Sequence, residues 1–546
     1  MVKQCLQCNK TFQINDQDLA FYKKLNVPIP HRCPDCRQIL RMQRRNFRAL
    51  YQRQSTLSNK PVISMYAPDS PYTVYSSTEW WHDNWDGLTY GRAFDFNKSF
   101  FEQFHVLNMA VPKEALYHVQ CDNSDYANLA FKAKNCYLVF GCVENENCLY
   151  GHIVWHSKDC IDGLYLYHCE LCYQAIDCVN GYKNIYSTEC TDCTEIYFSY
   201  NCRGCRNCFG CVGLVHKQWQ WFNKQLTEEQ YHNNLKAVLP FTPAKIAQMQ
   251  QQVAGLREQI VVPAYYGIHN ENVSGNHIYY SSACRHCFDV KHCEQSNYIF
   301  TGEHFVDTYD TSFSPGPAEQ CYNSLTLQNG RNVFCSHFIF DGTNLFYCDS
   351  CYACKDCFGC SGLRHKQYCV FNKQYTETDY RSLVARITDQ MKKLGEWGEF
   401  FPSSHSPFAY NESSAYEYYP LTKEQALVRG YRWREPDAKE YRSSNYTISD
   451  DITVVDDAIL KAILACNHCG KNYKLLPPEL QFYRQEKLFI PKQCPDCRHL
   501  SRMRQRNPRQ LWQRSCPKCQ RAMPTSYVPA RPEQVYCQEC YNKAIY

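Results

Sequence analysis

The sequence predicts a mainly β protein that contains two consecutive β-solenoids with a 12-residue period, capping helices and a zinc-ribbon module at each end. Three observations predict this class. Residues 135–218 repeat with the step that leads from Cys136 to Cys148, the cysteine pairs of the N-terminus recur at the C-terminus, and the segment at 210–231 recurs at 359–380. A fixed short period with apolar residues in register is typical of a solenoid, in which each unit packs on its neighbours.

Length and composition favour a multidomain chain in a reducing compartment. A chain of 546 residues predicts three or more domains. Its first residues, MVKQCLQC, contain no apolar signal segment, and no apolar run is long enough to cross a membrane. We therefore expect a cytoplasmic protein without a membrane partner, whose 37 cysteines are metal ligands where paired and small buried residues elsewhere.

Charge is distributed unevenly along the chain. Residues 1–55 hold 11 Lys and Arg against 3 Asp and Glu, and residues 466–546 hold 15 against 5. Because the whole chain has a net charge of only +5, the middle is acidic. Basic ends predict an anionic partner, either a nucleic acid or an acidic protein. The sequence leaves the oligomeric state open.

The predicted zinc ribbons at 1–54 and 461–514 are copies of one module. Two C-x2-C pairs supply the four thiolates of a structural zinc site, and the offset that relates Cys5 to Cys466 holds at all four cysteines without a gap. A proline directly after the third cysteine favours a helix start near Pro34 and near Pro495. The predicted ligands are Cys5, Cys8, Cys33 and Cys36 in the first module and Cys466, Cys469, Cys494 and Cys497 in the second.

These motifs carry a resemblance. The segments FYKKLNVPIPHRCPDCR and FYRQEKLFIPKQCPDCR, together with the cysteine spacing, resemble the treble-clef or zinc-ribbon family. The whole-chain pattern is similar to uncharacterised cysteine-rich bacterial proteins whose ends are such ribbons. The resemblance implies structural zinc but no particular activity.

A further ribbon is expected at 515–546, with Cys516, Cys519, Cys537 and Cys540 as ligands. The same offset carries these positions back to Ser55, Ser58, Ser76 and Glu79. We interpret residues 55–80 as a degenerate ribbon without thiolate ligands, and expect about three zinc ions per chain. The alternative is an ordinary loop that aligns by chance.

A helical connector is expected at 81–112, because Phe100, Phe101, Phe104 and Leu107 have helical spacing. The first solenoid follows at 113–224. Its repeating frame has an apolar third column, expected to be stacked in the core as strand-turn-strand rungs, and cysteines in the second and eighth columns. The third column contains Tyr137, Leu149, Ile161, Tyr173, Ile185, Tyr197 and Phe209.

Capping helices are predicted at 225–262 and at 375–396, around a second solenoid at 263–374. Thr227 with Gln230 and Thr376 with Asp379 have the spacing of helix N-caps. The second aromatic column contains Tyr298, Tyr322, Phe334, Phe346 and Phe358, is interrupted by Asp310, and is expected to extrude a loop at 314–317. Residues 397–460 are predicted to be a linker with one short helix after Thr422.

Arginines follow each terminal zinc pair at helical spacing. Such stripes fit phosphate groups, and Tyr51 and Trp512 beside them could stack on bases. The alternative is a solvated face, or a face paired with the acidic solenoids. The candidate nucleic-acid contacts are Arg37, Arg41, Arg44, Arg45, Arg48, Arg498, Arg502, Arg504, Arg506 and Arg509.

Catalytic and cluster chemistry are the remaining alternatives. Cysteine runs at 202–211 and 348–360 have iron–sulfur-like spacing but are more simply buried thiols. Asp159, Asp162, Asp177 and Asp307 form no evident pair, which disfavours a carbohydrate-active enzyme on a solenoid face. The sequence therefore predicts a non-catalytic zinc scaffold that binds RNA or DNA through its ribbons, or that serves only structural and protein-protein contacts.

Overall fold

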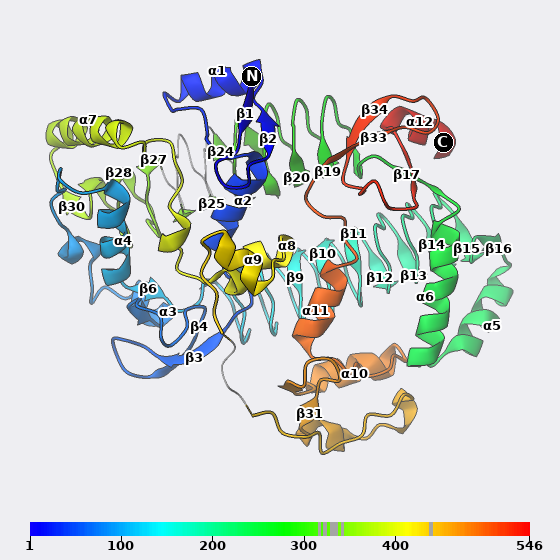
Figure 1. The fold of residues 1–546 in the computed structure, drawn as a ribbon. Helices are drawn as coiled ribbons and strands as arrows, with labels where there is room; N and C mark the ends of the chain where they lie inside the picture. Colours follow the sequence, from blue (N-terminus) through cyan, green and yellow to red (C-terminus); the bar gives the residue numbers. More distant parts are fainter. Residues whose placement is uncertain (315–317, 320–324, 328–336, 340–342, 436–439, 546) are drawn as a thin grey trace.

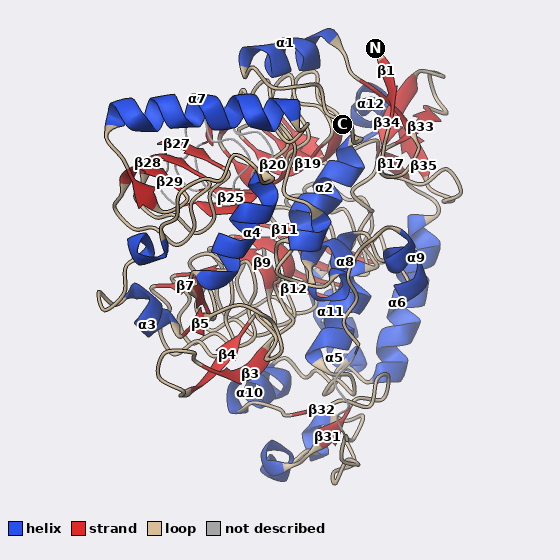
Figure 2. Cartoon of the chain, turned by 60° about the vertical axis from the view of Figure 1, so that its left-hand side comes forward, coloured by secondary structure: helices blue, strands red, loops and turns tan. Residues whose placement is uncertain are grey.

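The computed structural model describes residues 1–546 except 315–317, 320–324, 328–336, 340–342, 436–439 and 546 (Figure 1). Its described part contains many short strands and 12 α-helices, with cysteine groups near both termini. Two stacks of parallel strands lie in the middle, and the terminal segments lie over them (Figures 1 and 2).

The two terminal cysteine modules have the same local structure. The first has a β1–β2 hairpin, the short helix α1 and then α2, which begins at the predicted Pro34. The C-terminal copy repeats this order, and α11 begins at Pro495. Their bounds are β1 Val2–Gln4, β2 Thr11–Gln13, α1 Asp16–Lys24, α2 Pro34–Gln43, β31 Leu464–Ala465, β32 Asn472–Tyr473, α10 Pro477–Gln485 and α11 Pro495–Met503.

A second pair of modules follows the first. Tyr51 pairs with Ser64 in the β3–β4 hairpin, and Trp512 pairs with Thr525 in the β33–β34 hairpin, at the same offset that relates the cysteine modules. A short helix ends each copy. The bounds are β3 Tyr51–Gln54, β4 Pro61–Ser64, β5 Val74–Tyr75, α3 Ser77–Trp81, β33 Trp512–Ser515, β34 Ala522–Thr525, β35 Gln534–Tyr536 and α12 Gln538–Ile545.

The first stack is built from parallel strands whose partners lie one sequence period apart. Leu164 pairs with His152 on one side and with Ile176 on the other. One turn of the chain therefore corresponds to a single period, whereas the sequence alone had left open whether a turn spans one period or two. The strands of this stack are β7 His118–Val119, β8 Ala130–Phe131, β9 His152–Trp155, β10 Leu164–Tyr167, β11 Ile176–Val179, β12 Tyr182–Ile185, β13 Thr194–Tyr197, β14 Arg206–Phe209 and β15 Gln218–Trp221.

Each turn has four short sides rather than the expected strand-turn-strand shape. Bridges between turns recur at every third residue, as at Phe140, Val143 and Glu146. Between them, a residue with a φ of about +50° also recurs every third position, at Asn147 and Tyr150 for example. This left-handed conformation bends the chain at the corners between the sides and is uncommon for bulky side chains. The long period of the sequence thus contains a hidden period of three.

Small side chains fill the inside of the first stack. Cys136, Cys142, Cys148 and Cys172 belong to a buried cluster whose members all come from this stack. Thiols and hydroxyls there donate to two backbone carbonyls, as the Cys148 thiol does to Glu146 and Ser157. The apolar third column lies outside this cluster. Its members are buried instead against the C-terminal modules and α6, in a second cluster that includes Leu149, Ile161, Tyr173, Ile185, Tyr197 and Phe209.

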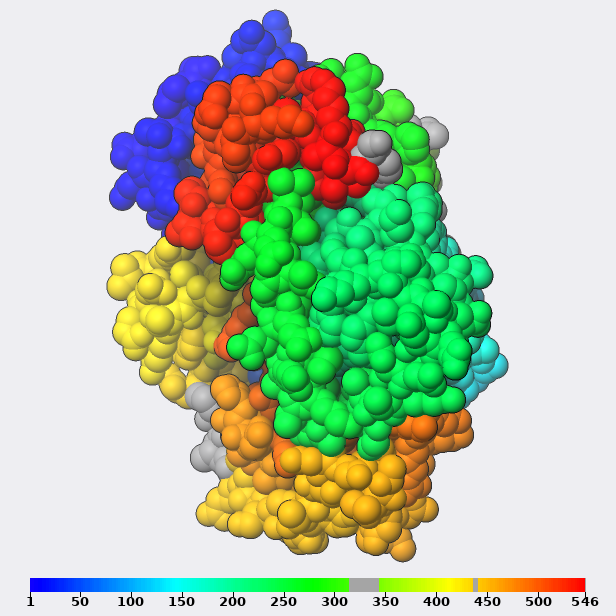
Figure 3. Space-filling model, turned by 90° about the vertical axis from the view of Figure 1, so that its right-hand side faces the viewer, coloured from blue at the N-terminus to red at the C-terminus, as the bar shows by residue number. Residues whose placement is uncertain are grey.

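Helices cover the stack ends at the predicted places. Thr227 and Gln230 form a capping box at the start of α5, and the Thr376 hydroxyl accepts from the Asp379 N–H at the start of α7. α6 runs along the edge of the first stack (Figure 3). The bounds are α4 Phe100–Ala110, α5 Glu228–Val238, α6 Pro243–Arg257 and α7 Glu377–Lys393.

The second stack is also parallel. Phe288 pairs with Phe300, one period on, whereas Ser312 pairs with Leu325, one position further than the period requires. The predicted members Tyr322 and Phe334, and most of the loop at 314–317, lie outside the described residues. The strands are β18 Gly267–Ile268, β19 Gly275–Tyr279, β20 Cys287–Lys291, β21 Phe300–Glu303, β23 Ser312–Ser314, β25 Leu325–Leu327, β26 His337–Ile339, β27 Thr343–Phe346, β28 Lys355–Phe358 and β29 Gln367–Val370.

The first half of the segment predicted to be a linker contributes buried residues to the core, whereas residues 440–445 are exposed. Tyr410, Ala415, Ala426 and Tyr431 are buried, and the Ser414 N–H donates to the Arg45 carbonyl at 2.6 Å. Its helices are α8 Ser414–Tyr418 and α9 Lys423–Val428, the latter capped by Thr422 as predicted. No helix in the described ranges combines the length and apolar character that a bilayer crossing requires.

Candidate metal centres

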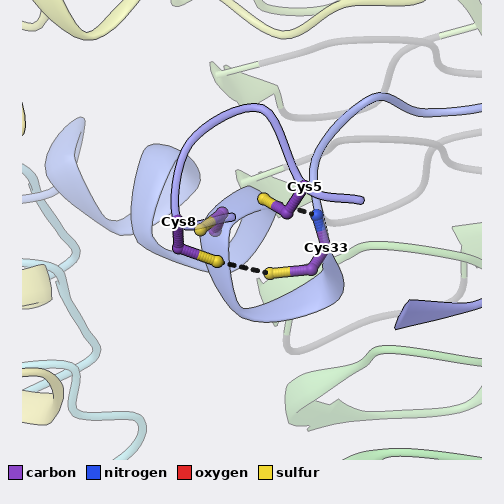
Figure 4. Close-up of side chains that lie close together, drawn as sticks. Cys5, Cys8 and Cys33 are labelled. Carbon is purple, nitrogen blue, oxygen red and sulfur yellow. Dashed lines mark hydrogen bonds between the residues drawn. The ribbon is translucent and has the colours of Figure 1, made fainter. Parts of the chain in front are cut away.

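Three groups of four cysteines bring their sulfur atoms together. In each group all ligand atoms lie within 4.8 Å of one another. The sulfur atoms of Cys8 and Cys33 are 3.7 Å apart, and one pair of sulfur atoms in each C-terminal group is also 3.7 Å apart. Figure 4 shows the side chains of Cys5, Cys8 and Cys33 converging. The groups are Cys5, Cys8, Cys33 and Cys36; Cys466, Cys469, Cys494 and Cys497; and Cys516, Cys519, Cys537 and Cys540.

This spacing fits zinc and not disulfides. A disulfide joins sulfurs at about 2.05 Å. Four sulfurs at the usual Zn–S length of about 2.3 Å stand about 3.8 Å apart at the corners of a tetrahedron. The observed 3.7 Å matches that edge. The donor sets therefore fit the three zinc ions that the sequence predicts.

Backbone N–H groups lower the pKa of the first cysteine thiol in both C-terminal groups, which favours metal binding. Burial opposes ionisation of Cys466, but N–H groups of Cys494, Cys469 and His468 outweigh it and lower the pKa of this thiol to about 6. The corresponding amides around Cys516 lower its pKa to about 6 as well, again against burial. A thiol with such a pKa is largely a thiolate at neutral pH, which is the form that binds metal.

The module at 55–80 corresponds to the last cysteine group, but it has a carboxylate where that group has thiols. Ser55 donates its hydroxyl to Glu79, and the Ser76 N–H donates to the same carboxylate at 2.9 Å. Burial opposes the charge, but hydrogen bonds from Ser55, Ser58 and Ser76 lower the pKa of Glu79 to about 2. The four positions that correspond to the cysteines thus converge through hydrogen bonds.

The candidate nucleic-acid contacts are mostly inside the protein. Of the ten arginines, Arg504 is exposed, and the other nine side chains are at most 9 % exposed. The nine are Arg37, Arg41, Arg44, Arg45, Arg48, Arg498, Arg502, Arg506 and Arg509. A phosphate contact requires a guanidinium group at the surface. These nine therefore form no phosphate-binding face in this structure.

Equivalent arginines of the two modules clamp one aspartate each. Arg498 and Arg502 of α11 bind Asp162 at 2.8 and 2.9 Å. Arg37 and Arg41 of α2, at the same positions of the other copy, bind Asp310, each at 3.0 Å. Both carboxylates are fully buried. The C-terminal module is thus clamped to the first stack and the N-terminal module to the second.

The chain after α11 makes a further clamp between the two stacks. Arg506 binds Asp177 of the first stack at 2.8 Å and Asp289 of the second at 2.6 Å. Arg509 also binds Asp289. Although burial opposes its charge, Arg506 and Arg509 hold the pKa of Asp289 at about 2. Asp162, Asp177, Asp289 and Asp310 are therefore ion-pair partners of the arginines in and after the two basic helices.

A cleft between the stacks has a volume of about 220 Å³ and is lined by aromatic, histidine and carboxylate groups. Trp155, Tyr167, Tyr279 and His277 contribute to it, together with Asp177. His277 Nε2 lies 3.5 Å from a Glu189 oxygen. Burial first, and then the charge of Asp177, raises the pKa of Glu189 well above its usual range.

The two cysteine runs behave as buried thiols. The thiols of Cys202, Cys205 and Cys208 donate to backbone carbonyls, and so do those of Cys348 and Cys354. Neither run forms a metal-binding group within the described ranges. Two groups that the sequence analysis missed are His152 with Glu417 and His499, and His277 with Asp177 and Asp289. One signal was available: His499 stands where the N-terminal copy has Gln38.

Searches of the whole chain against protein-family models, curated proteins and solved structures found no match.

Proposed function

We propose that this chain is a non-catalytic zinc scaffold, in which zinc-ribbon modules lock two β-solenoids side by side. Parallel turns of one sequence period each, with a filled interior, support the solenoid interpretation. The single observation that carries the proposal is the duplicated clamp, because both copies of the module bury two arginines against one aspartate of a stack. A duplicated element that keeps the same docking chemistry is best explained by an architectural role.

Zinc has a definite part in this proposal. Small modules with little core of their own depend on metal for folding. The orientation of α2 and α11 follows from the cysteine groups at their first turns, so zinc sets the direction in which the arginines point. Loss of zinc should then loosen both modules from the stacks.

Chelation tests this scaffold proposal. Treatment of the full chain with a strong chelator should release zinc and make residues 1–54 and 461–546 sensitive to a protease, while the stacks stay resistant. Mass spectrometry of the fragments locates the cleavage. Resistant ends after complete zinc removal would show that the metal does not hold the modules.

A filter-binding assay tests nucleic-acid binding separately. Because nine of the ten candidate arginines are buried, the scaffold should retain little RNA or DNA on a filter at low salt. Tight retention that falls steeply with salt would indicate phosphate contacts and favour the nucleic-acid hypothesis instead.

Action on a carbohydrate is a second candidate, favoured by the cleft between the stacks. Its aromatic side chains could stack on sugar rings, Asp177 lines the cleft, and the Glu189 carboxyl group lies 3.5 Å from His277, which also lines it. Asp177 is, however, already bound by Arg506. Hydrolysis of a polysaccharide panel by the wild type, lost in Glu189→Gln, would support this candidate, and no hydrolysis would remove it.

A further inference from the structure

Three segments far apart in the sequence meet at a group of potential metal ligands. His152 comes from β9 of the first stack, Glu417 from α8, and His499 from α11. One ligand atom from each lies within 4.8 Å of the other two. Both histidines are almost completely buried, and the Glu417 side chain is 11 % exposed. The group stands at the junction of a stack, the central segment and a zinc module.

The distances suit coordination better than hydrogen bonding. Glu417 Oε2 lies 3.4 Å from His499 Nε2 and 3.7 Å from His152 Nε2. A good hydrogen bond between such atoms is about 2.7–3.2 Å long. Ligands of a tetrahedral zinc ion with bonds of about 2.0–2.1 Å stand about 3.3–3.4 Å apart. The two distances from Glu417 are thus close to the edges of a zinc coordination tetrahedron.

Two of these three atoms have no hydrogen-bond partner among the described residues, and the third has a long hydrogen bond. Glu417 Oε2 and His499 Nε2 are buried, and neither has a hydrogen-bond partner among the residues that the structure describes. His152 Nε2 lies 3.3 Å from the Tyr418 hydroxyl. A buried polar atom without a partner costs about 1–3 kcal/mol. A cation between the three side chains would remove that cost at both atoms.

The neighbouring charges leave room for a cation here and not at the other mixed group. At Asp177, His277 and Asp289, the carboxylates are already bound by Arg506 and Arg509. Beside the His152 group, the nearby Arg48 is bound to Asp496 at 3.0 Å. Arg502, which also lies near, is bound to Asp162. Arg48 and Arg502 therefore have carboxylate partners of their own.

We propose that His152, Glu417 and His499 bind a fourth zinc ion, which differs from the other three in having no thiolate ligand. Two imidazoles and a carboxylate are a known zinc donor set that leaves a fourth position open. A cavity of about 250 Å³ lined by Glu417 and Tyr418 lies next to the group and can hold a water ligand. The ion joins the first stack, α8 and α11, and so adds a metal contact to the clamp made by Arg498 and Arg502.

Cobalt substitution of the full chain tests this site separately from the cysteine sites. Thiolate-bound Co²⁺ has strong near-ultraviolet charge-transfer bands, whereas Co²⁺ bound by imidazole and carboxylate shows only weaker visible bands. Titration of the metal-free protein should give three equivalents with charge transfer and one without. Elemental analysis of the zinc-loaded protein should give four equivalents.

His499→Gln is the sharpest variant, because it installs the residue that the N-terminal copy has at Gln38. It should bind three equivalents with unchanged charge-transfer bands. Glu417→Gln keeps the shape of the side chain and should show the same loss, and the exposed His82→Gln should bind four. Three equivalents in the wild type, or four in both His499→Gln and Glu417→Gln, would refute the fourth site. Loss of the charge-transfer bands would instead refute the cysteine sites and the scaffold proposal.

Discussion

Asp162→Asn should release the C-terminal module from the first stack. The substitution keeps the shape of the side chain but removes the charge that Arg498 and Arg502 share at 2.8 and 2.9 Å. Both guanidinium groups would stay buried without this charged partner. Glu479, at 3.6 Å from Arg498, would still lie near them. Breaking a buried ion pair by removing one partner costs about 3–5 kcal/mol.

The size of this effect sets the assay. A loss of about 3 kcal/mol changes the ratio of docked to undocked module roughly 150-fold, since about 1.4 kcal/mol is a factor of ten. Hydrogen exchange of the α11 amides should therefore accelerate by about two orders of magnitude, together with a lower urea midpoint. Asp310→Asn should do the same to α2, because Arg37 and Arg41 form the equivalent clamp.

Asp122→Asn is the matched control, since it makes the same change at an exposed position of the same stack. It should alter the free energy of unfolding by less than about 0.5 kcal/mol. If Asp162→Asn has the same urea midpoint and the same α11 hydrogen-exchange rates as this control, the arginines are not the docking groups. The explanation of the buried basic stripe would then be wrong.

Four further outcomes are expected. Cys494→Ser should lower the zinc content by one ion and unfold mainly its own module, as elemental analysis and proteolysis would show; a protein that keeps all its zinc would contradict this. Tyr173→Asp should lower the thermal midpoint, because this ring packs 5.6 Å from that of Tyr483; an unchanged midpoint would mean that the third column faces solvent. Changing both Arg498 and Arg502 to Gln should destabilise the protein without changing filter retention of RNA, and lost retention would restore the phosphate hypothesis. Cys172→Ser should cost less than about 1.5 kcal/mol, since the hydroxyl can donate to the same carbonyls; loss of a bound metal in that variant would indicate a cluster.

Short-range features of the fold could be predicted from the sequence. The period of the repeat predicted stacked units but left open whether one turn spans one period or two, which the strand pairing settles as one, and the constant offset between the two ends predicted four module positions, including the one at Glu79. Helix starts at Pro34 and Pro495 followed from local chemistry, because proline fits the first position of a helix. Such features depend on neighbouring residues.

The interior of the stack was predicted on the wrong side. Large aromatic residues such as Tyr173 were predicted to form the interior of the stack. Small residues such as Cys172 fill it instead, because the inside of so short a turn is narrow. The aromatic column is buried because a module encoded near the C-terminus covers it. A sequence pattern gives burial, but it does not tell which partner buries the residue.

Long-range partners were out of reach for a similar reason. Asp162 looked like one of several scattered acids and Asp310 like a break in the aromatic column, and pairing of the arginines with the acidic solenoids was only one of the alternatives. Only the tertiary arrangement brings a charge at 37 next to a charge at 310. Glu417 lies in a segment that has no periodicity and was therefore expected to be a linker.

The crossed docking of the two modules has a consequence for synthesis. Arg37 and Asp310 are 273 residues apart, so at about 5–20 residues per second the first module waits on the order of 10–60 s for its docking partner. During that interval its zinc site can already form, while Arg37 and Arg41 face water. The nascent chain thus transiently displays a basic helix that the finished protein hides.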